Sequence, residues 1–349
     1  MRVGTPPRAS LDRLLALRGP GLSLGAATPH KEWLHFAVHA PDVDVVVNFS
    51  IVSSGPGTRR GQGSARVGRV AILVHTDRWQ GGLERCPDAA LAVRDAGTRL
   101  LLGESRLELR DGRFFLEATL ASGELSASLE LEPITRPVQI QNFALENGPP
   151  MSWLVVPRLL ATGWVRHPGG TVRVARAPAY HDHNWGRFEW GADFTWEWGY
   201  ALPREPHVPW SLVFVRISDR ARLSDWVSGL FVWSGETPER AFAADELDVA
   251  HEGLLRQERL LKIPGVLGLL SPGTDTDVPR RLVVSARRGA DHVDLAFESR
   301  TLAQLLVPHE RGSGLTAIHE VAGRVRVQGA ITGAPIDFES PSIFEFLRA

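Results

Sequence analysis

The most distinctive stretch of this chain is Tyr180-His181-Asp182-His183-Asn184-Trp185-Gly186. Strand-like sequence flanks it, so we expect an extended strand in which successive side chains point to opposite faces of a sheet. His181 and His183 then share one face. Asp182 and Asn184 share the other, which presents a carboxyl group beside an amide.

An acid of this kind suits chemistry on a hydrocarbon. If the face with Asp182 is buried, the carboxyl group loses solvation, its protonated form is favoured, and it becomes a proton donor near neutral pH. Tryptophan rings can line an apolar chamber and stabilise a developing cation; those nearby are Trp185, Trp190, Trp196 and Trp198. The alternative interpretation is structural, because Asp, Asn and Gly favour turns and Trp is common in cores.

The sequence outside this stretch predicts an all-β protein. Short alternating or β-branched runs separated by turn residues are typical of antiparallel sheets. The expected strands are 43–52, 67–75, 113–120, 124–131, 171–176, 210–217, 226–233, 281–286, 292–297 and 324–331. Glycine tolerates positive φ, so we expect hairpin connections at 111–112, 122–123, 168–170 and 288–290.

Few helices are expected. The candidates are 11–17 and 237–247, the second opened by Thr237 with Pro238 at the first helical position.

Three prolines in 203–209 predict a domain boundary. We therefore expect two all-β domains, 1–205 with the motif and 206–349. The Gly- and Pro-rich segment 255–280 is expected to be a long loop that covers a pocket mouth.

Composition excludes several classes of function. With 349 residues, 43% of them apolar, and a net charge of -1, the chain has material for a core but no basic surface for nucleic acid. The single cysteine, Cys86, excludes an intramolecular disulfide and a cysteine-rich zinc site, and we expect a structural thiol. No run approaches the ~20 apolar residues that cross a bilayer, so we expect a soluble cytoplasmic protein.

Metal and nucleotide chemistry lack their usual motifs. The pair His181 and His183 can chelate a metal, but a cupin-type site would place a carboxylate three or four residues further on, and the next is Glu189. We expect no metal and no other cofactor, although other histidines leave a distant ligand open. A Gly-x-Ser-x-Gly elbow and a Walker loop are both absent from the sequence.

The chain resembles a two-domain lipocalin-like family. That family includes bacterial carotenoid 1,2-hydratases (hydroxyneurosporene synthases), AttH-like proteins and, more distantly, plant tocopherol cyclases and fungal Diels-Alderases. The resemblance is carried by 155–163, 179–186 and 196–198, with support from 32–36 and 320–325. It implies two lipocalin-like β-barrel or sandwich domains packed side by side with few short helices. It also implies a cavity at or near the domain interface that binds an apolar isoprenoid or polyketide, with at most transient membrane contact.

The resemblance also implies residue roles. Asp182 matches the acid thought to protonate an isolated double bond, Asn184 is its companion, and Trp196 and Trp198 lie beside the site. His181 and His183, which differ from some hydratases, can act as a base or orient a hydroxyl. The remaining substrate-binding candidates are Tyr180, Trp185 and Trp33.

Three functions remain open at this point. The first is a hydratase or cyclase that adds a proton from Asp182 to a C=C bond. The second is a pericyclase, which folds a polyene into a reactive shape and tolerates loss of that acid. The third is a protein that binds a lipophilic ligand without catalysis.

Overall fold

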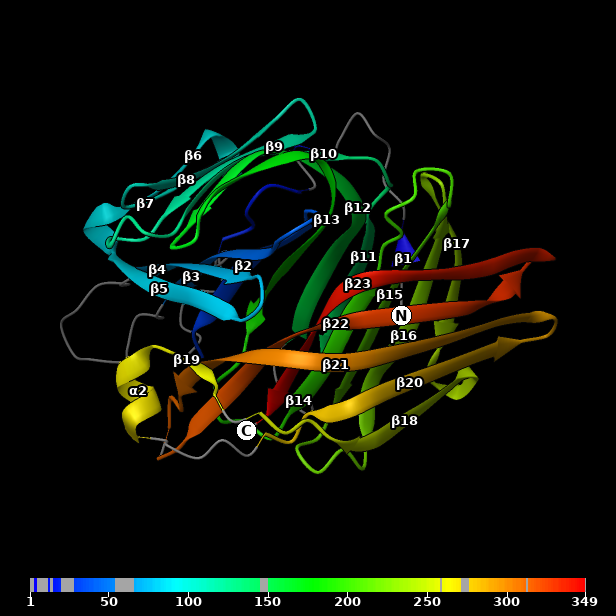
Figure 1. The fold of residues 1–349 in the computed structure, drawn as a ribbon. Coiled ribbons are helices and arrows are strands. Elements are labelled where there is room, and N and C mark those ends of the chain that lie inside the picture. The colour runs from blue at the N-terminus through cyan, green and yellow to red at the C-terminus, as the bar shows by residue number, and fades with distance from the viewer. Residues whose placement is uncertain are drawn as a thin grey trace. The chain divides into compact units, whose positions relative to one another are not determined.

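The structure, a computed structural model, describes residues 3–4, 12, 15–19, 28–53, 66–144, 150–257, 259–270, 276–311 and 313–348. The protein is all-β, with 71% strand and 5% helix, which confirms the expected fold class. Its strands form two sheets in two compact units, Met1–Thr76 with Gln80–Glu189 and Asp77–Trp79 with Trp190–Ala349 (Figure 1). Among the described residues, no helix is long and apolar enough to span a membrane.

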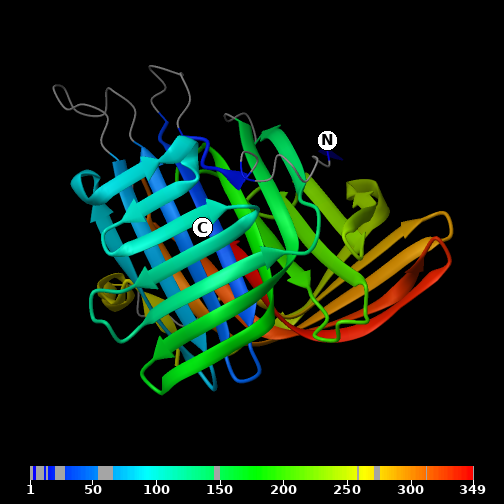
Figure 2. The same ribbon diagram turned by 90° about the horizontal axis from the view of Figure 1, so that it is seen from above.

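The sheet of the first unit curls into a nearly closed barrel (Figure 2). Its strands follow the order β5 (Trp79–Pro87), β4 (Arg66–His75), β3 (Asp44–Ser53), β2 (His30–His39), β13 (Gly170–Arg187), β12 (Pro150–His167), β10 (Ser126–Pro133), β9 (Arg113–Thr119), β8 (Ser105–Arg110), β7 (Arg99–Leu102) and β6 (Leu91–Arg94), with β11 (Val138–Ala144) on β12 and β1 (Val3–Gly4) on β11. Neighbouring strands are antiparallel, so hairpins join most of them.

The distinctive stretch lies in the middle of this barrel wall. In β13, residues 179–183 are all buried, and in β2 only Trp33 is half-exposed. Side chains of both strands that face inward join the apolar core of the unit, with Leu34, Phe36 and Ala179 among them. Because the opposite faces of these strands are buried as well, both sides of the stretch are shielded from water.

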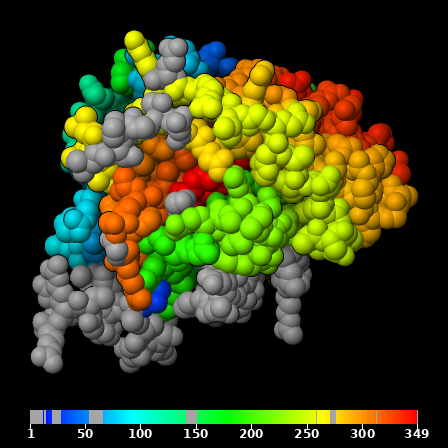
Figure 3. Space-filling model, turned by 90° about the horizontal axis from the view of Figure 1, so that it is seen from below, coloured from blue at the N-terminus to red at the C-terminus, as the bar shows by residue number. Residues whose placement is uncertain are grey.

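The second unit is built on a second sheet. Its strands follow the order β17 (Thr237–Ala243), β16 (Asp225–Ser234), β15 (Trp210–Ser218), β14 (Thr195–Ala201), β23 (Ala334–Arg348), β22 (Leu315–Ile331), β21 (Asp291–Pro308), β20 (Pro279–Arg288) and β18 (Leu247–Leu254), with the short β19 (Leu261–Ile263) parallel to β21. Aromatic and branched side chains such as Phe214, Phe297 and Phe344 form its core. The edge strand β18 exposes most of its side chains (Figure 3).

The expected strands and four hairpin connections are confirmed, but several strands are longer than the local pattern indicated. β12, β13 and β21 each have 18 residues, and β22 has 17. Within β13 and β12 the pairing register shifts between Ala161 and Gly163. Such a β-bulge lets a long strand bend around a barrel, and a bulge interrupts the two-residue alternation that marks a strand in sequence.

The expected helix at 237–247 is wrong. Residues 237–243 form β17, paired with β16, and only Ala244–Glu246 make a single 3-10 turn. Phe242 is fully buried in the core, so sheet pairing and burial override the local helix-start signal of Thr237 and Pro238. The expected helix at 11–17 falls partly outside the described residues, although Ala16 donates a helical hydrogen bond to the Asp12 carbonyl.

Two further expectations differ from the structure. Segment 255–280 contains β19 and α2 (Gly265–Leu270) and is not loop throughout; residues 258 and 271–275 lie outside the described part. The two units divide between Glu189 and Trp190 and not at 205/206. β14 pairs with β15 and β23, so sheet hydrogen bonds hold it in the second unit, and the proline-rich segment only links β14 to β15.

Gly199→Ala is expected to destabilise the second unit by about 1–3 kcal/mol. A Cβ at Gly199 would lie 2.3 Å from the Phe344 ring, and that ring is buried and stacked on Phe297 at 4.1 Å between centroids. Urea denaturation measures the change. Gly265→Ala is the matched control, because a Cβ there meets nothing within 4 Å. Equal midpoints for the two variants would contradict the prediction.

Candidate functional site

One face of β13 carries a hydrogen-bonded acid. Asp182 is 1% exposed; its Oδ2 accepts from the Tyr180 hydroxyl at 3.0 Å and its Oδ1 from the Asn184 amide at 2.7 Å. The three residues alternate along one extended strand, so they point to the same face, as the sequence predicted. A buried carboxyl group with both oxygens hydrogen-bonded is held in one orientation.

The amide of Asn184 decides where Asp182 can carry a proton. Its N–H₂ group only donates, so Oδ1 must act as an acceptor. A proton on this carboxyl group is therefore on Oδ2, beside the Tyr180 hydroxyl, which can both donate and accept. The pair provides a route for a proton to or from Asp182.

β2 contributes to the same face. His35 lies opposite Asp182 and Trp33 opposite Asn184. The His35 ring meets the edge of the Tyr180 ring at 6.4 Å, and burial lowers the pKa of His35 to about 3, so its imidazole is neutral at physiological pH. Trp33 packs edge-on against Phe188 at 5.9 Å. An acid, a phenol, an amide, a neutral imidazole and an indole thus share this face.

His181 and His183 point into the barrel, away from Asp182. The His181 ring stacks on Phe36 at 4.3 Å and contacts Phe114 at 4.5 Å, and its Nδ1 donates to the His35 carbonyl at 2.9 Å. Burial, followed by the nearby His183, holds the pKa of His181 well below its usual value. His181 is a neutral side chain of the barrel interior, so it cannot act on a group that Asp182 protonates.

His183 and Trp185 belong to a second polar cluster on that interior face. His183 Nε2 lies 2.8 Å from Glu32 Oε1, and its ring lies 4.8 Å from the Trp185 ring. The guanidinium of Arg18 covers Trp185 at 5.2 Å. His183 and Trp185, both candidate site residues, thus lie on the face of β13 opposite to Asp182, as the alternation of side chains along a strand predicts.

In the second unit, Trp196 and Trp198 surround the carboxyl group of Glu345, which is not among the candidate residues named from the sequence. Their indole N–H groups both donate to Glu345 Oε1, at 2.5 and 2.9 Å. Glu320 lies opposite Glu345 on β22 and hydrogen-bonds to it. Burial raises the pKa of Glu345, although its hydrogen bonds to Trp198, Glu320 and Trp196 oppose the rise. Two buried carboxyl groups in contact favour one shared proton.

Glu197, between the two tryptophans, lies in the opposite environment. It is also buried, but Arg348 lies at 2.6 Å, His251 at 2.9 Å and Arg216 at 3.8 Å from its oxygens. Burial opposes ionisation of Glu197, yet hydrogen bonds and charges from His251 and Arg348 lower its pKa to about 2. Glu197 therefore stays ionised at neutral pH, whereas burial raises the pKa of Glu345.

A sequence signal for Glu345 exists. It is the only charged residue in Ile343-Phe344-Glu345-Phe346-Leu347, and an isolated carboxylate within an apolar run marks either a buried acid or an outward-facing position. Its tryptophan partners are about 150 residues away in the chain. Only strand pairing decides which of the two applies.

Glu345→Gln is expected to become more stable relative to the wild type as the pH rises from 4.5 to 8. A raised pKa means that the folded chain binds more protons than the unfolded chain above the ordinary value of 4.5. The contribution of Glu345 is therefore fully present below that pH and is lost as the pH rises through the folded-state pKa. Gln stays neutral and avoids the loss.

Urea denaturation at several pH values measures this difference. Glu339→Gln, at an exposed carboxylate that pairs with Arg324, is the control. A stability difference between Glu345→Gln and the wild type that does not change with pH would contradict a raised pKa.

The fold and these clusters describe a two-unit, lipocalin-like all-β protein with buried acids. No protein-family model matches the chain, and no curated protein matches it either. A solved structure from Nitrosomonas europaea, provisionally described as AttH, is similar with a TM-score of 0.61 at 14% identity, over 95% of this chain and 96% of that one.

Two other solved structures are similar over most of their length. Kievitone hydratase from Nectria haematococca has a TM-score of 0.57 at 12% identity and covers 96% of this chain and 93% of its own. CghA has a TM-score of 0.51 at 11% identity, over 92% and 88%. At these identities the likeness establishes the fold, and activity must be argued from the site.

Proposed function

We propose that this protein is an acid-dependent hydratase or cyclase of an unsaturated, lipophilic small molecule, with Asp182 as the proton donor. The observation that carries the proposal is the buried Asp182 carboxyl group between the Tyr180 hydroxyl and the Asn184 amide. The substrate class is a polyene, terpenoid or polyketide-like lipid. A hydratase with the same fold, kievitone hydratase, supports the reaction type.

The proposed step transfers the Oδ2 proton of Asp182 to one carbon of a C=C bond. The π electrons form the new C–H bond, and the other carbon becomes a tertiary cation. In a hydratase, water attacks the cation, and the proton that it releases returns to the Asp182 carboxylate, so the acid is regenerated. In a cyclase, an internal hydroxyl attacks the cation and loses its proton to the Asp182 carboxylate. Alternatively, an internal alkene attacks, and the new cation that forms loses a proton from an adjacent carbon to the same carboxylate.

The neighbouring side chains have separate roles in this proposal. Asn184 fixes Oδ1 as an acceptor and so keeps the proton on Oδ2. The Tyr180 hydroxyl, which donates to that oxygen, passes a proton to and from it. Trp33 offers a π face to the cation. His35, neutral because burial lowers its pKa to about 3, adds no positive charge that would oppose a cation.

Isotope labelling tests the proposal. The purified protein is incubated with lipid extracts in D₂O and in H₂¹⁸O, and new products are identified by mass spectrometry. A hydratase gives a product about 18 mass units heavier in ordinary water. The product formed in D₂O carries one non-exchangeable deuterium, and the product formed in H₂¹⁸O carries one ¹⁸O. An acid-dependent cyclase gives an isomer with deuterium at carbon, unless the added proton is the one lost.

Two alternatives give different results in the same experiment. A pericyclase forms an isomer with neither isotope, because no proton is added. A non-catalytic protein forms no product but retains a co-purifying lipid. Either result would replace the proposed acid mechanism.

A further inference from the structure

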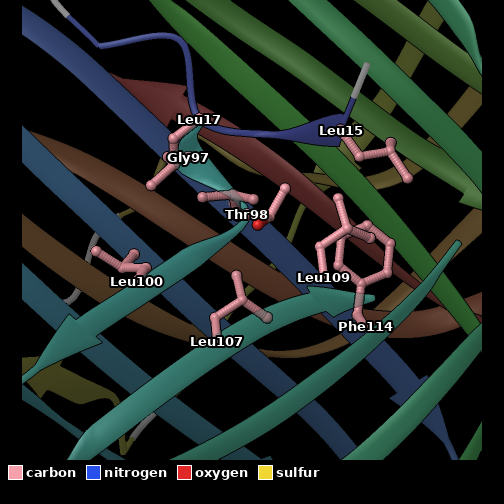
Figure 4. A pocket seen from close by; sticks show the side chains of 9 residues that line it. Leu15, Leu17, Gly97, Thr98, Leu100, Leu107, Leu109 and Phe114 are labelled. Carbon is pink, nitrogen blue, oxygen red and sulfur yellow. The ribbon is translucent and has the colours of Figure 1, made fainter. Parts of the chain in front are cut away.

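A lipophilic substrate of the proposed class must reach the protein from a lipid phase or from a store, and the pocket inside the first barrel is no store for it. Leucines line most of this pocket, with Leu15, Leu107 and Leu109 among them (Figure 4). The space that they leave free holds about one water molecule. A lipid must therefore be taken up elsewhere, and the surface of the second unit carries a feature that fits a lipid phase.

That feature is α2, which presents apolar side chains to solvent at one end of the second sheet (Figure 1). Val266 is 65% exposed and Leu269 is 82% exposed. They are three residues apart, so they lie on one face of the helix. Among the described residues, six large apolar side chains are exposed, and these two are the ones that share an element. A single exposed leucine is ordinary, but this pair forms a small apolar patch.

The strand β19 attaches α2 to the sheet of the second unit. Its last residue, Ile263, is 3% exposed, and β19 pairs with β21. The amides of Leu267 and Gly268 donate to the Pro264 carbonyl at 3.1 and 3.3 Å. The helix therefore begins directly after a buried, paired residue, which holds the apolar patch in place on the surface.

The segment before α2 is basic. Arg256 and Arg259 are exposed. Lys262 lies against the helix, because a Cβ on Gly268 would be 2.9 Å from the Lys262 Cβ. The sequence has no acidic residue from 259 to 274. An apolar patch bordered by cations is complementary to the surface of a bilayer that contains anionic lipids.

The size of the patch favours a bilayer over a protein partner. Two apolar side chains are far fewer than the roughly 20–30 residues a side of a stable protein interface. A bilayer surface requires no such area, because each Lys or Arg near anionic lipids raises the affinity about fivefold and apolar side chains add to this when they enter the headgroup boundary.

We propose that α2 docks the protein reversibly on an anionic lipid bilayer. Val266 and Leu269 enter the boundary between headgroups and acyl chains, and Arg256, Arg259 and Lys262 contact lipid phosphates. The bilayer then supplies the lipophilic substrate, which is the one point that rests on the proposed function. The docking itself is independent of Asp182.

Co-sedimentation of the full-length protein with vesicles tests the docking. The vesicles contain phosphatidylcholine alone or with phosphatidylglycerol, and we expect the wild type to bind the anionic vesicles, less so at high salt. The double variant Val266→Ser with Leu269→Ser is expected to bind at least about tenfold more weakly, because two aliphatic side chains no longer leave water. Leu223→Ser is the matched control: Leu223 is 85% exposed, but 219–225 contains two arginines and two aspartates. It should bind as the wild type does.

A fluorophore on α2 reports whether the helix enters the bilayer. It is attached to Leu269→Cys in a Cys86→Ala background, since Cys86 is the single cysteine of the chain. We expect its emission to rise and shift to shorter wavelength when anionic vesicles are added, and to be quenched by lipids with a nitroxide on the acyl chain. The same fluorophore on Leu223→Cys should respond several-fold less.

Three results would overturn the proposal. The first is no binding to anionic vesicles, or equal binding by the double variant and the Leu223→Ser control. The second is an unchanged emission from Leu269→Cys on vesicle-bound protein. The third is a wild-type dimer without vesicles that the double variant does not form, which would assign the patch to a second copy of the chain. Asp182→Asn is expected to bind vesicles as the wild type does, so failure of the catalytic proposal and failure of the docking are separate results.

Discussion

Asp182→Asn is expected to lower turnover at least about 100-fold, because general acid catalysis of a proton transfer contributes roughly 10²–10⁴-fold. Asn has nearly the same shape as Asp but carries no acidic proton. It can still hydrogen-bond to Tyr180 and Asn184, which both bond to the native side chain. The variant should therefore fold normally, so a lower turnover would reflect the missing acidic proton and not misfolding. Product formation under the labelling conditions above, followed over time, measures it.

Two further variants locate the proton. Tyr180→Phe removes the hydroxyl beside Oδ2. If turnover falls as far as it does in Asp182→Asn, the proton reaches the acid through Tyr180. A smaller fall in turnover indicates that the proton is transferred without Tyr180. Trp185→Phe is the control, because Trp185 lies on the opposite face of β13 and should leave turnover nearly unchanged. Full turnover by Asp182→Asn would exclude Asp182 as the acid and favour a shape-driven reaction.

Among these variants, Glu197→Gln is expected to lower the free energy of unfolding the most, by about 3–5 kcal/mol. Glu197 is buried, and its loss leaves the guanidinium of Arg348, also mostly buried, without its 2.6 Å partner. A shift of the Glu197 pKa from 4.5 to about 2 corresponds to about 3 kcal/mol, in the same range. Guanidinium chloride denaturation at neutral pH measures the difference.

The pH dependence has a definite sign. The folded-state pKa of Glu197 is depressed, so its contribution is present above about pH 4.5 and is lost as the pH falls towards 2. The wild type should approach the stability of Glu197→Gln over that interval. A stability difference that persists unchanged at pH 2 would contradict a depressed pKa.

Two controls separate the buried pair from ordinary surface charge. Glu339→Gln removes an exposed partner of Arg324 and should change stability little, because surface pairs contribute little. The double variant Glu197→Gln with Arg348→Met removes both charges. It should be more stable than Glu197→Gln alone, since no unpaired buried guanidinium remains.

Local sequence predicted the strands well and the helix at 237–247 wrongly, for related reasons. Alternation of apolar side chains is a direct consequence of strand geometry, so strands such as β3 and β15 can be read from a few residues. The capping signal at Thr237 is also local, but the pairing of β17 with β16 and the burial of Phe242 are not. Tertiary contacts outweigh a weak helical preference.

For the candidate site, too, one part follows from the local sequence and another part only from the tertiary structure. Sequence alone determined that Tyr180, Asp182 and Asn184 share one face and that the two histidines share the other, because the alternation belongs to the backbone of a single strand. Only the tertiary structure decided that the histidine face fills the barrel, that Glu32 binds His183, and that Trp196 and Trp198 surround Glu345. Those contacts join residues about 150 positions apart, and the register of strand pairing that creates them is fixed by the whole sheet and its core.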